Sequence, residues 1–419
     1  MFKKILSLCL VCFMLAGLCA GFASCGNDDG DKLSESPLPE KDLKVDFTVK
    51  KDLKIGFIFL HDEKSTYDKN FMDAAKKVQT LLGLSNEQVL FKYPVNEEEE
   101  CPKAAKELVE AGCDLIFADS FGHESGMLEV AKENPNVQFC HATGTQAHTA
   151  GLKNFHNAFA SIYQGRYLAG VAAGLKLNEM IESGKITKEQ AVMGYVGAFP
   201  YAEVKSGYTA FYLGAKSVCE SVTMKVNFTN SWFSVDDERQ NALALINDGC
   251  VLISQHADSM GAPSACESKN VPNISYNGST FEECPNSFIL SSRIDWAPYF
   301  LYIIKCVSTN TEIDTDWCGG IAEGSVVLTG INESVAAKGT LDKLKEVAAK
   351  LKDGSLKVFD TSKFTVKGKT LTEYMADVDT DAAFTPDHNV IHDGYFDESG
   401  KDFRSAPYFD IDIDGITIK

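Results

Sequence analysis

The chain has 419 residues, 44% of them hydrophobic, and a formal net charge of −19 at pH 7. A strongly acidic chain of this composition gives no support for binding to nucleic acid or to an anionic membrane surface. Its length exceeds the size at which a single hydrophobic core stops growing, so two lobes are expected.

Residues 1–24 have the layout of a secretory signal peptide. A basic start is followed by an almost unbroken apolar run from Ile5 to Phe22, and small residues precede Cys25. Small side chains before a cysteine are typical of a bacterial lipobox, so we expect cleavage before Cys25 and diacylation of its sulfur. The alternative is an uncleaved helix of about 18 residues, near the lower limit for spanning a bilayer, and its glycines and alanines disfavour it. The protein is therefore expected at the extracytoplasmic face of the cell membrane, held by lipid.

Residues 25–51 are predicted to form a flexible tether, because they are rich in Asp, Glu, Ser, Lys and Pro. Beyond Leu53, short apolar runs alternate with amphipathic stretches, as in a parallel sheet covered by helices on both faces. The first lobe is assigned to residues 52–158. Its predicted strands are 54–60, 89–93, 115–119 and 137–141, and its helices are a first one ending at Gly83, then 98–111 and 124–133.

A second lobe with the same α/β pattern is predicted for residues 159–279. The crossover into it lies just before Tyr163, and small residues between Ala169 and Gly174 predict a closely packed helix. Its predicted strands are 193–197, 223–228, 251–255 and 273–276, and its helices are 203–217, 235–247 and 259–268.

The C-terminal third is harder to assign to a lobe. Residues 280–318, with a strand at 288–291 and a helix at 296–307, are expected to return to the first lobe, and part of 319–360 belongs to the second. A helix at 341–351 and a strand at 356–359 follow. Residues 361–419 mix turn signals with short apolar pieces, and their placement is left open.

Neither the cysteines nor the histidines point to a metal or a cofactor. Three of the 13 cysteines, Cys9, Cys12 and Cys19, lie in the predicted signal peptide, and the others contain no CxxC pair. The mature-chain cysteines lie beside apolar segments, which favours buried thiols over disulfides. His388 and His392 are four residues apart, but the nearby Pro386 and Gly394 favour an exposed loop over a metal site.

A ligand site is expected at the carboxyl ends of the strands, where loops converge and helix N-termini offer free donors. The segments there combine aromatic rings with single polar groups, a set that suits a flat, purine-like heterocycle. Core packing is the alternative for Phe71 and Phe199, and helix capping is the alternative for Asp258. The candidate ligand-binding residues are Asp62, Tyr67, Phe71, Ser120, Phe121, Phe199, Trp232, Asp258 and Asn277.

The order of several motifs resembles the basic membrane protein family of bacterial lipoproteins, which have the periplasmic-binding-protein-like type I fold and include purine nucleoside receptors. The resemblance covers about Lys54 to Leu328. It is carried by Asp119-Ser-Phe-Gly122, Val130 to Phe139, Arg166-Tyr-Leu-Ala-Gly170, Gly194 to Pro200, Thr229-Asn-Ser-Trp-Phe233, Gln255-His-Ala-Asp-Ser259 and Tyr276-Asn-Gly278.

This resemblance implies two doubly wound lobes joined by a hinge and a receptor that passes a purine base or nucleoside to an ABC permease. Tyr67 or Phe71 and Trp232 are then the stacking residues, and Asp258 is the acid that reads the base. Asn277 stands where nucleoside-binding members place an acidic residue for ribose. A ligand sensor, a surface adhesin or a receptor for another polar solute such as a sugar remain alternatives. An enzyme is disfavoured, because nucleophile-elbow, phosphate-loop and zinc-protease motifs are absent from the sequence.

Overall fold

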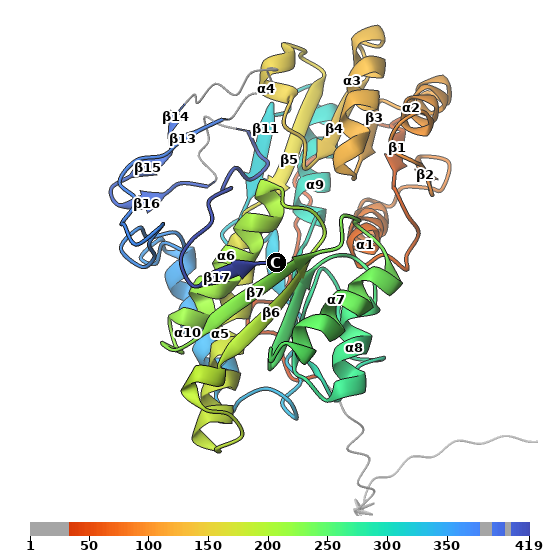
Figure 1. The fold of residues 1–419 in the computed structure, drawn as a ribbon. Coiled ribbons are helices and arrows are strands. Elements are labelled where there is room, and N and C mark those ends of the chain that lie inside the picture. Colours follow the sequence, from red (N-terminus) through yellow and green to blue (C-terminus); the bar gives the residue numbers. More distant parts are fainter. Residues whose placement is uncertain (1–32, 378–387, 399–403) are drawn as a thin grey trace, which may run out of the picture. The chain divides into compact units, whose positions relative to one another are not determined.

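The computed structural model describes residues 33–377, 388–398 and 404–419, and two β-sheets organise them (Figure 1). The predicted signal peptide and Cys25 lie outside the described residues. Neighbouring strands of the first sheet all pair in parallel. In order across this sheet, the strands are β11 (Asp316–Gly319), β5 (Phe155–Ala160), β4 (Gln138–Ala142), β3 (Leu115–Ala118), β1 (Ile55–Ile58) and β2 (Val89–Lys92).

The second sheet is parallel except where β10 meets β12. Its strands in order are β12 (Val326–Leu328), β10 (Phe288–Ile294), β9 (Asn273–Tyr276), β8 (Leu252–His256), β6 (Val192–Gly197), β7 (Thr223–Phe228) and β17 (Ile416–Ile418). The chain passes between the sheets after β5, after β10 and after β11. Each sheet with its helices forms one lobe, which confirms the predicted two-lobed α/β architecture.

Helices cover both faces of each sheet, because successive side chains of a strand point to opposite faces. In the first lobe, Phe57 and Phe59 face α1 (Thr66–Leu82) and α9 (Ala297–Thr309). Ile58 faces α2 (Glu100–Glu110) and α3 (Glu124–Glu133) instead. In the second lobe, α5 (Ile162–Glu182) and α6 (Ala202–Lys216) cover one face, while α7 (Val235–Asn247) and α8 (Gly261–Lys269) cover the other.

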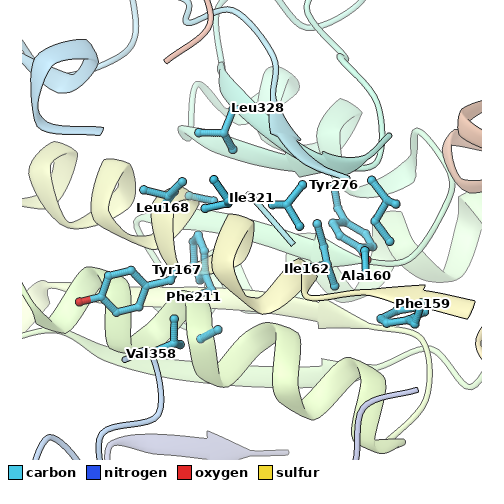
Figure 2. Packing of buried hydrophobic residues seen from close by; sticks show 14 of the residues in the cluster. Phe159, Ala160, Ile162, Tyr167, Leu168, Phe211, Tyr276, Ile321, Leu328 and Val358 are labelled. Carbon is cyan, nitrogen blue, oxygen red and sulfur yellow. The ribbon is translucent and has the colours of Figure 1, made fainter. Parts of the chain in front are cut away.

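Apolar packing runs without interruption through the region where the chain crosses between the lobes. Figure 2 shows Phe159 at the end of the first sheet and Tyr276 of the second sheet in one cluster with Ile162 and Ile321, which flank two of the crossovers. Arg166, fully buried on α5, donates hydrogen bonds to Ser254 Oγ of β8 at 2.6 Å and to the carbonyl of Ser275 in β9 at 3.3 Å. These bonds tie α5 to the second sheet immediately after the first crossover.

Helices α5 and α6 approach each other very closely, as the small residues near Gly170 predict. A Cβ atom at Gly170 would lie 2.0 Å from the carbonyl oxygen of Phe211, and one at Gly214 would lie 2.0 Å from that of Tyr167. Only glycine allows this backbone contact. The predicted stop of the first helix is also observed, since Gly83 caps α1 with φ +64°.

Two assignments of the C-terminal part differ from expectation, and a third that the sequence left open is now placed. Phe288–Ile294 joins the second sheet as β10 and not the first lobe, although α9 after it packs on α1 in the first lobe. Residues 356–359 are irregular and not a strand, although Val358 and Phe359 are buried. The last residues form β17, which extends the second sheet beside β7, so the end of the tail completes a lobe that begins more than two hundred residues earlier.

The segment 33–49, predicted as part of a tether, lies against the folded body. It has no helix or strand, yet Ser34 donates to the carbonyl of Ile331 at 2.9 Å and Leu38 accepts from the backbone of Leu328 at 2.9 Å. Glu40 forms ion pairs with Lys77 and Arg293. The amino-acid composition of the segment did not predict this packing, because its acidic side chains form ion pairs with lysine and arginine residues that are far away in the sequence.

The remaining elements are short. They are α4 (Ala147–Ala150), η1 (Phe121–His123), η2 (Lys188–Gln190), β13 (Met375–Ala376), β14 (His388–Asn389), β15 (Ile391–His392) and β16 (Tyr395–Phe396), with the longer α10 (Thr340–Lys352) packed on α5. Among the cysteines that the structure describes, eight are free and buried, as favoured by the sequence: Cys101, Cys113, Cys140, Cys219, Cys250, Cys266, Cys284 and Cys306. Within the described ranges, no helix combines the length and the apolar character needed to cross a bilayer.

Candidate ligand-binding pocket

One pocket lies between the carboxyl ends of the two sheets, with an empty volume of about 370 Å³, part of it open to solvent. In the first sheet, β2 lies on one side of β1 and β3 on the other, and in the second sheet β7 and β8 lie on opposite sides of β6. The strand order therefore reverses between β1 and β3 and between β6 and β8, and open α/β sheets bind ligands at such points of reversal. The pocket is lined by Leu60, His61, Tyr67, Asp68, Ser120, Phe121, Thr143, Glu203, Trp232, His256, Asp258 and Tyr276.

Five of the nine candidate residues from the sequence meet at this pocket. Tyr67, Ser120 and Phe121 come from the first lobe, and Trp232 and Asp258 come from the second. Tyr67, Trp232 and Asp258, which were predicted to face a common ligand, therefore line one cavity.

The other four candidates lie elsewhere. Asp62 turns back to accept from the backbone N–H of Lys64 at 3.1 Å. Phe71 is fully buried and stacks on Trp296 with ring centroids 4.4 Å apart, because its place on the apolar stripe of α1 faces the core. Phe199 packs against Trp232 with ring centroids 5.1 Å apart and does not line the pocket. Asn277 is buried next to Asp258 and does not line the pocket either.

Sequence reasoning missed four polar lining residues in particular, Asp68, Thr143, Glu203 and His256. Asp68 and Glu203 look like ordinary first-turn acids of helices, which stabilise the helix dipole. Thr143 follows β4 with φ +65°, a left-handed conformation that is rare for a β-branched residue and that no local sequence signal reveals. All four residues could have been found from their position in the sequence, because each lies at the carboxyl end of a predicted strand or in the first helical turn after one.

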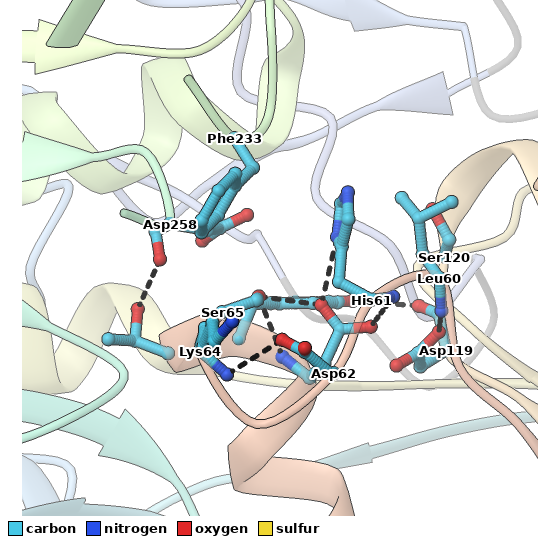
Figure 3. Close-up of polar contacts among 12 residues, drawn as sticks. Leu60, His61, Asp62, Lys64, Ser65, Asp119, Ser120, Phe233 and Asp258 are labelled. Carbon is cyan, nitrogen blue, oxygen red and sulfur yellow. Dashed lines mark hydrogen bonds and ion pairs between the residues drawn. The ribbon is translucent and has the colours of Figure 1, made fainter. Parts of the chain in front are cut away.

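A hydrogen-bonded acid cluster forms the wall contributed by the first lobe (Figure 3). Asp68 accepts from Ser65 Oγ at 2.6 Å and from the backbone N–H of His61 at 2.7 Å, and its Oδ2 lies 3.2 Å from Nδ1 of the His61 ring. Burial alone would raise the pKa of Asp68, but these hydrogen bonds hold it below its usual value. Burial and the charge of Asp68 raise the pKa of the neighbouring Asp119 well above normal. Asp68 is therefore the ionised acid of this cluster.

Asp258 is the buried acid on the second-lobe side. Burial raises its pKa well above the usual value, and the charges of Glu238, Asp68 and Glu203 add to the rise, while the neighbouring Asn277 opposes it. Two glutamates sit near it: Glu203 contacts His256 Nε2 at 3.4 Å, and Glu238 accepts from the backbone N–H of Ser259 at 3.1 Å. Among the described residues that line the pocket there is no lysine or arginine. The pocket is therefore suited to ligands with N–H donors and unsuited to phosphate or carboxylate groups.

Aromatic rings from both lobes meet at the edge of the pocket. Phe199 stacks on Tyr201 with centroids 5.0 Å apart and planes 9° apart, and Trp232 packs against both rings. Phe121 of the first lobe lies 5.6 Å from Tyr201 of the second. Phe121 and Tyr201 remain 41% and 44% exposed, so their outer faces are at the surface.

The lobes also touch through polar contacts beside the ligand-facing groups. The backbone N–H and Oγ1 of Thr66, at the start of α1, donate to the carbonyl oxygen of Asp258 at 3.1 and 3.3 Å. The ring centroids of His61 from the first lobe and Phe233 from the second lie 5.4 Å apart (Figure 3). These contacts bring the two halves of the pocket together, as expected for lobes that close on a ligand.

Glu238 makes the stability of the protein depend on pH. Burial raises its pKa from 4.5 to about 7, so the folded state favours its protonated form. This contribution is complete below pH 4.5 and is lost as the pH rises towards and through 7. We expect the free energy of unfolding to fall by about 1–3 kcal/mol over this window.

Thermal unfolding from pH 4.5 to 8 tests this expectation. Glu238→Gln should flatten the fall in melting temperature, whereas Glu129→Gln at an exposed position should leave the slope unchanged. An identical slope in wild type and Glu238→Gln would contradict the assignment.

Comparisons with known proteins identify the family of the chain. A family model described as ABC transporter substrate-binding protein, PnrA-like, matches residues 58–360. A purine-binding protein from Brucella abortus (strain 2308) is 31% identical over 313 residues, which are 73% of this chain and 83% of that protein. A protein from Haloferax volcanii that is named as an ABC transporter glucose-binding protein is 33% identical over 216 residues, 51% of each chain.

The fold has solved counterparts. A solute-binding protein of an ABC transporter system from Conexibacter woesei DSM 14684 superposes with a TM-score of 0.60 at 17% identity, over 73% of this chain and 98% of that one. The expected periplasmic-binding-protein-like fold is thereby confirmed, and the matched family consists of transport receptors and not enzymes. The chain belongs to the PnrA-like family of ABC transporter substrate-binding proteins.

Proposed function

We propose that this protein binds a purine base or a purine nucleoside between its lobes and delivers it to the permease of an ABC importer. The observation that carries the proposal is the shared cavity of Trp232, Tyr67 and Asp258, which offers aromatic faces and a buried acid to one ligand. An aromatic face stacks on a flat heterocycle, and a carboxylate accepts from its ring N–H or amino group. The purine-binding relative from Brucella abortus supports the same ligand class.

A thermal-shift panel tests the ligand class directly. Purine bases, nucleosides, nucleotides, sugars and amino acids are added to the protein that starts at residue 26, because a ligand that binds only the folded state raises the melting temperature. We expect bases or nucleosides to stabilise the protein and the corresponding 5′-phosphates not to, since three acids and no lysine or arginine line the pocket among the described residues. Stabilisation by sugars alone would contradict the proposal.

Trp232 is expected to contribute a stacking surface. Its replacement by alanine should weaken binding by about 1–3 kcal/mol, the range measured for bases on aromatic side chains. Trp232→Phe keeps a ring in place and should retain most of the affinity, and Tyr93→Ala removes an exposed aromatic residue away from the pocket. Calorimetric titration distinguishes these cases, and unchanged affinity in Trp232→Ala would remove this residue from the binding site.

A sugar is the second candidate ligand. The same wall of carboxylates and one tryptophan can accept hydrogen bonds from hydroxyl groups and cover the apolar face of a pyranose ring. The glucose-binding relative from Haloferax volcanii favours this candidate, although that match covers 51% of each chain. The panel above separates the two classes in a single experiment.

We also propose that Cys25 carries a lipid that holds the protein on the extracytoplasmic face of the cell membrane. The basic start, the apolar run and the small residues before Cys25 support this anchor. Expression of wild type and Cys25→Ser in a bacterial host supplied with labelled palmitate is the test. Label and detergent-phase partitioning should be present in wild type and lost in Cys25→Ser, and label retained in the variant would refute the assignment.

A further inference from the structure

Four of the described residues that line the pocket carry a hydroxyl group, and two of these hydroxyls already have a hydrogen-bond partner within the protein. Ser120 Oγ donates to Glu97 Oε1 at 2.5 Å, and Tyr67 Oη donates to the backbone carbonyl of Asp119 at 2.8 Å. Each of these hydrogens has a fixed acceptor, so neither hydroxyl is available as a donor to a ligand.

The other two hydroxyls have no such partner. Thr143 Oγ1 and Tyr276 Oη are both buried, with 3% and 2% of the residue exposed, and neither forms a hydrogen bond with any described residue. A buried hydroxyl without a partner destabilises the folded protein by about 1–3 kcal/mol. A buried polar group without a partner calls for an explanation, and here two such hydroxyls belong to residues that line the same pocket.

Both residues are held in place by the backbone around them. Thr143 follows β4, and its N–H donates to the carbonyl of Ala158 at 3.0 Å, which fixes a left-handed φ of +65°. Strained backbone of this kind clusters at ligand-binding sites. Tyr276 ends β9, and its ring lies 4.3 Å from that of His256. Thr143 belongs to the first lobe and Tyr276 to the second, so the two residues line the pocket from opposite lobes.

The surroundings of Tyr276 keep its hydroxyl protonated. Burial raises the pKa of Tyr276 well above its usual value, and the negative charge of Glu203 raises it further. A protonated phenol is a hydrogen-bond donor, whereas the carboxylates of Asp68, Glu203 and Asp258 in the same wall can only accept when ionised. The wall therefore combines groups that accept with hydroxyls free to donate.

We infer that Thr143 and Tyr276 are specificity-determining residues, whose hydroxyls donate hydrogen bonds to acceptor atoms of the ligand while the carboxylates accept from its N–H groups. The inference rests on the proposed purine ligand and adds that the ligand must present hydrogen-bond acceptors as well as N–H donors. A purine meets this requirement, because its unprotonated ring nitrogens and carbonyl oxygens accept while its ring N–H and amino groups donate. When the purine stacks on Trp232 and donates to Asp258, acceptor atoms of its ring remain, and Thr143 and Tyr276 can donate hydrogen bonds to them from opposite lobes.

The test measures calorimetric binding of adenine, hypoxanthine, adenosine and inosine together with the melting temperature of the empty protein. Tyr276→Phe and Thr143→Ala should each weaken binding of the tightest probe by about tenfold or more. Thr143→Ser keeps the hydroxyl and should restore most of the affinity. The empty Tyr276→Phe protein should melt at or above the wild-type temperature, because no internal hydrogen bond is lost.

Tyr67→Phe is the matched control for stability. It removes a hydroxyl with a partner in the protein, so it should lower the melting temperature of the empty protein. Unchanged dissociation constants in both Tyr276→Phe and Thr143→Ala would overturn the inference and leave the proposed function standing. A wild-type protein that binds none of the four probes would overturn the proposed function, and the inference with it.

Discussion

Replacement of Gly214 by alanine is expected to lower the free energy of unfolding by about 3 kcal/mol or more. The new methyl carbon would lie 2.0 Å from the carbonyl oxygen of Tyr167 on α5, and a backbone atom within a packed helix cannot move aside alone. Alanine is a better helix former than glycine by about 1 kcal/mol, which is too little to offset the separation of α5 from α6. Chemical or thermal unfolding followed by circular dichroism measures the change.

Gly320→Ala provides the comparison for this variant. There the nearest atom to the new methyl carbon is Oε1 of Gln164 at 2.9 Å, the end of a flexible side chain that can rotate. We expect Gly320→Ala to retain most of the stability. A melting temperature of Gly214→Ala equal to that of wild type would show that the α5–α6 contact is looser than the structure indicates.

Replacement of Asp258 by asparagine is expected to weaken binding of the purine ligand by about 100-fold. The change keeps the shape of the side chain, but an amide group presents a donor where the ligand N–H requires an acceptor. Because it also removes a carboxyl whose pKa is raised by burial, the empty variant should be as stable as wild type at neutral pH or more so. Calorimetric titration and thermal unfolding give the two readouts.

The pH dependence of binding provides a second readout for Asp258. Protonation of its carboxyl removes the acceptor, so affinity should fall as the pH is lowered, and the raised pKa places this fall above the normal range of aspartate near 3.8. Asp258→Asn should lose this dependence. Asp62→Asn changes an acid on the neighbouring loop that lies outside the pocket wall and should bind like wild type. Equal affinities in wild type and Asp258→Asn would exclude a role in reading the ligand.

Much of the fold could be predicted because periodicity is a local signal. The helix at 124–133 and the strand at 223–228 have the predicted bounds, and Gly83 ends α1 where it was expected. Sheet membership is not local, which is why Phe288–Ile294 was assigned to the wrong lobe and the pairing of Ile416–Ile418 with β7 was not foreseen. Apolar strands carry no mark that identifies the sheet they will join.

The candidate site was predicted in outline for the same reason. Strand ends can be read from the sequence, and Trp232 and Asp258 follow strand ends. The direction of a side chain cannot be read in this way: Phe71, four residues after Tyr67 on the same helix, points into the core, while Tyr67 reaches the pocket. Thr143 gave no signal because its unusual backbone conformation is imposed by neighbouring strands.

We expect the contact between Thr66 and Asp258 to couple ligand binding to closure of the two lobes. The carbonyl of Asp258 receives the hydrogen bonds from α1, and its carboxyl belongs to the pocket wall, so one residue serves both the interface between lobes and the ligand. A measured dissociation constant then equals the intrinsic constant divided by the fraction of molecules already closed. Substitutions far from the pocket that favour the open arrangement would thus weaken apparent affinity in proportion to that fraction, with every ligand contact intact.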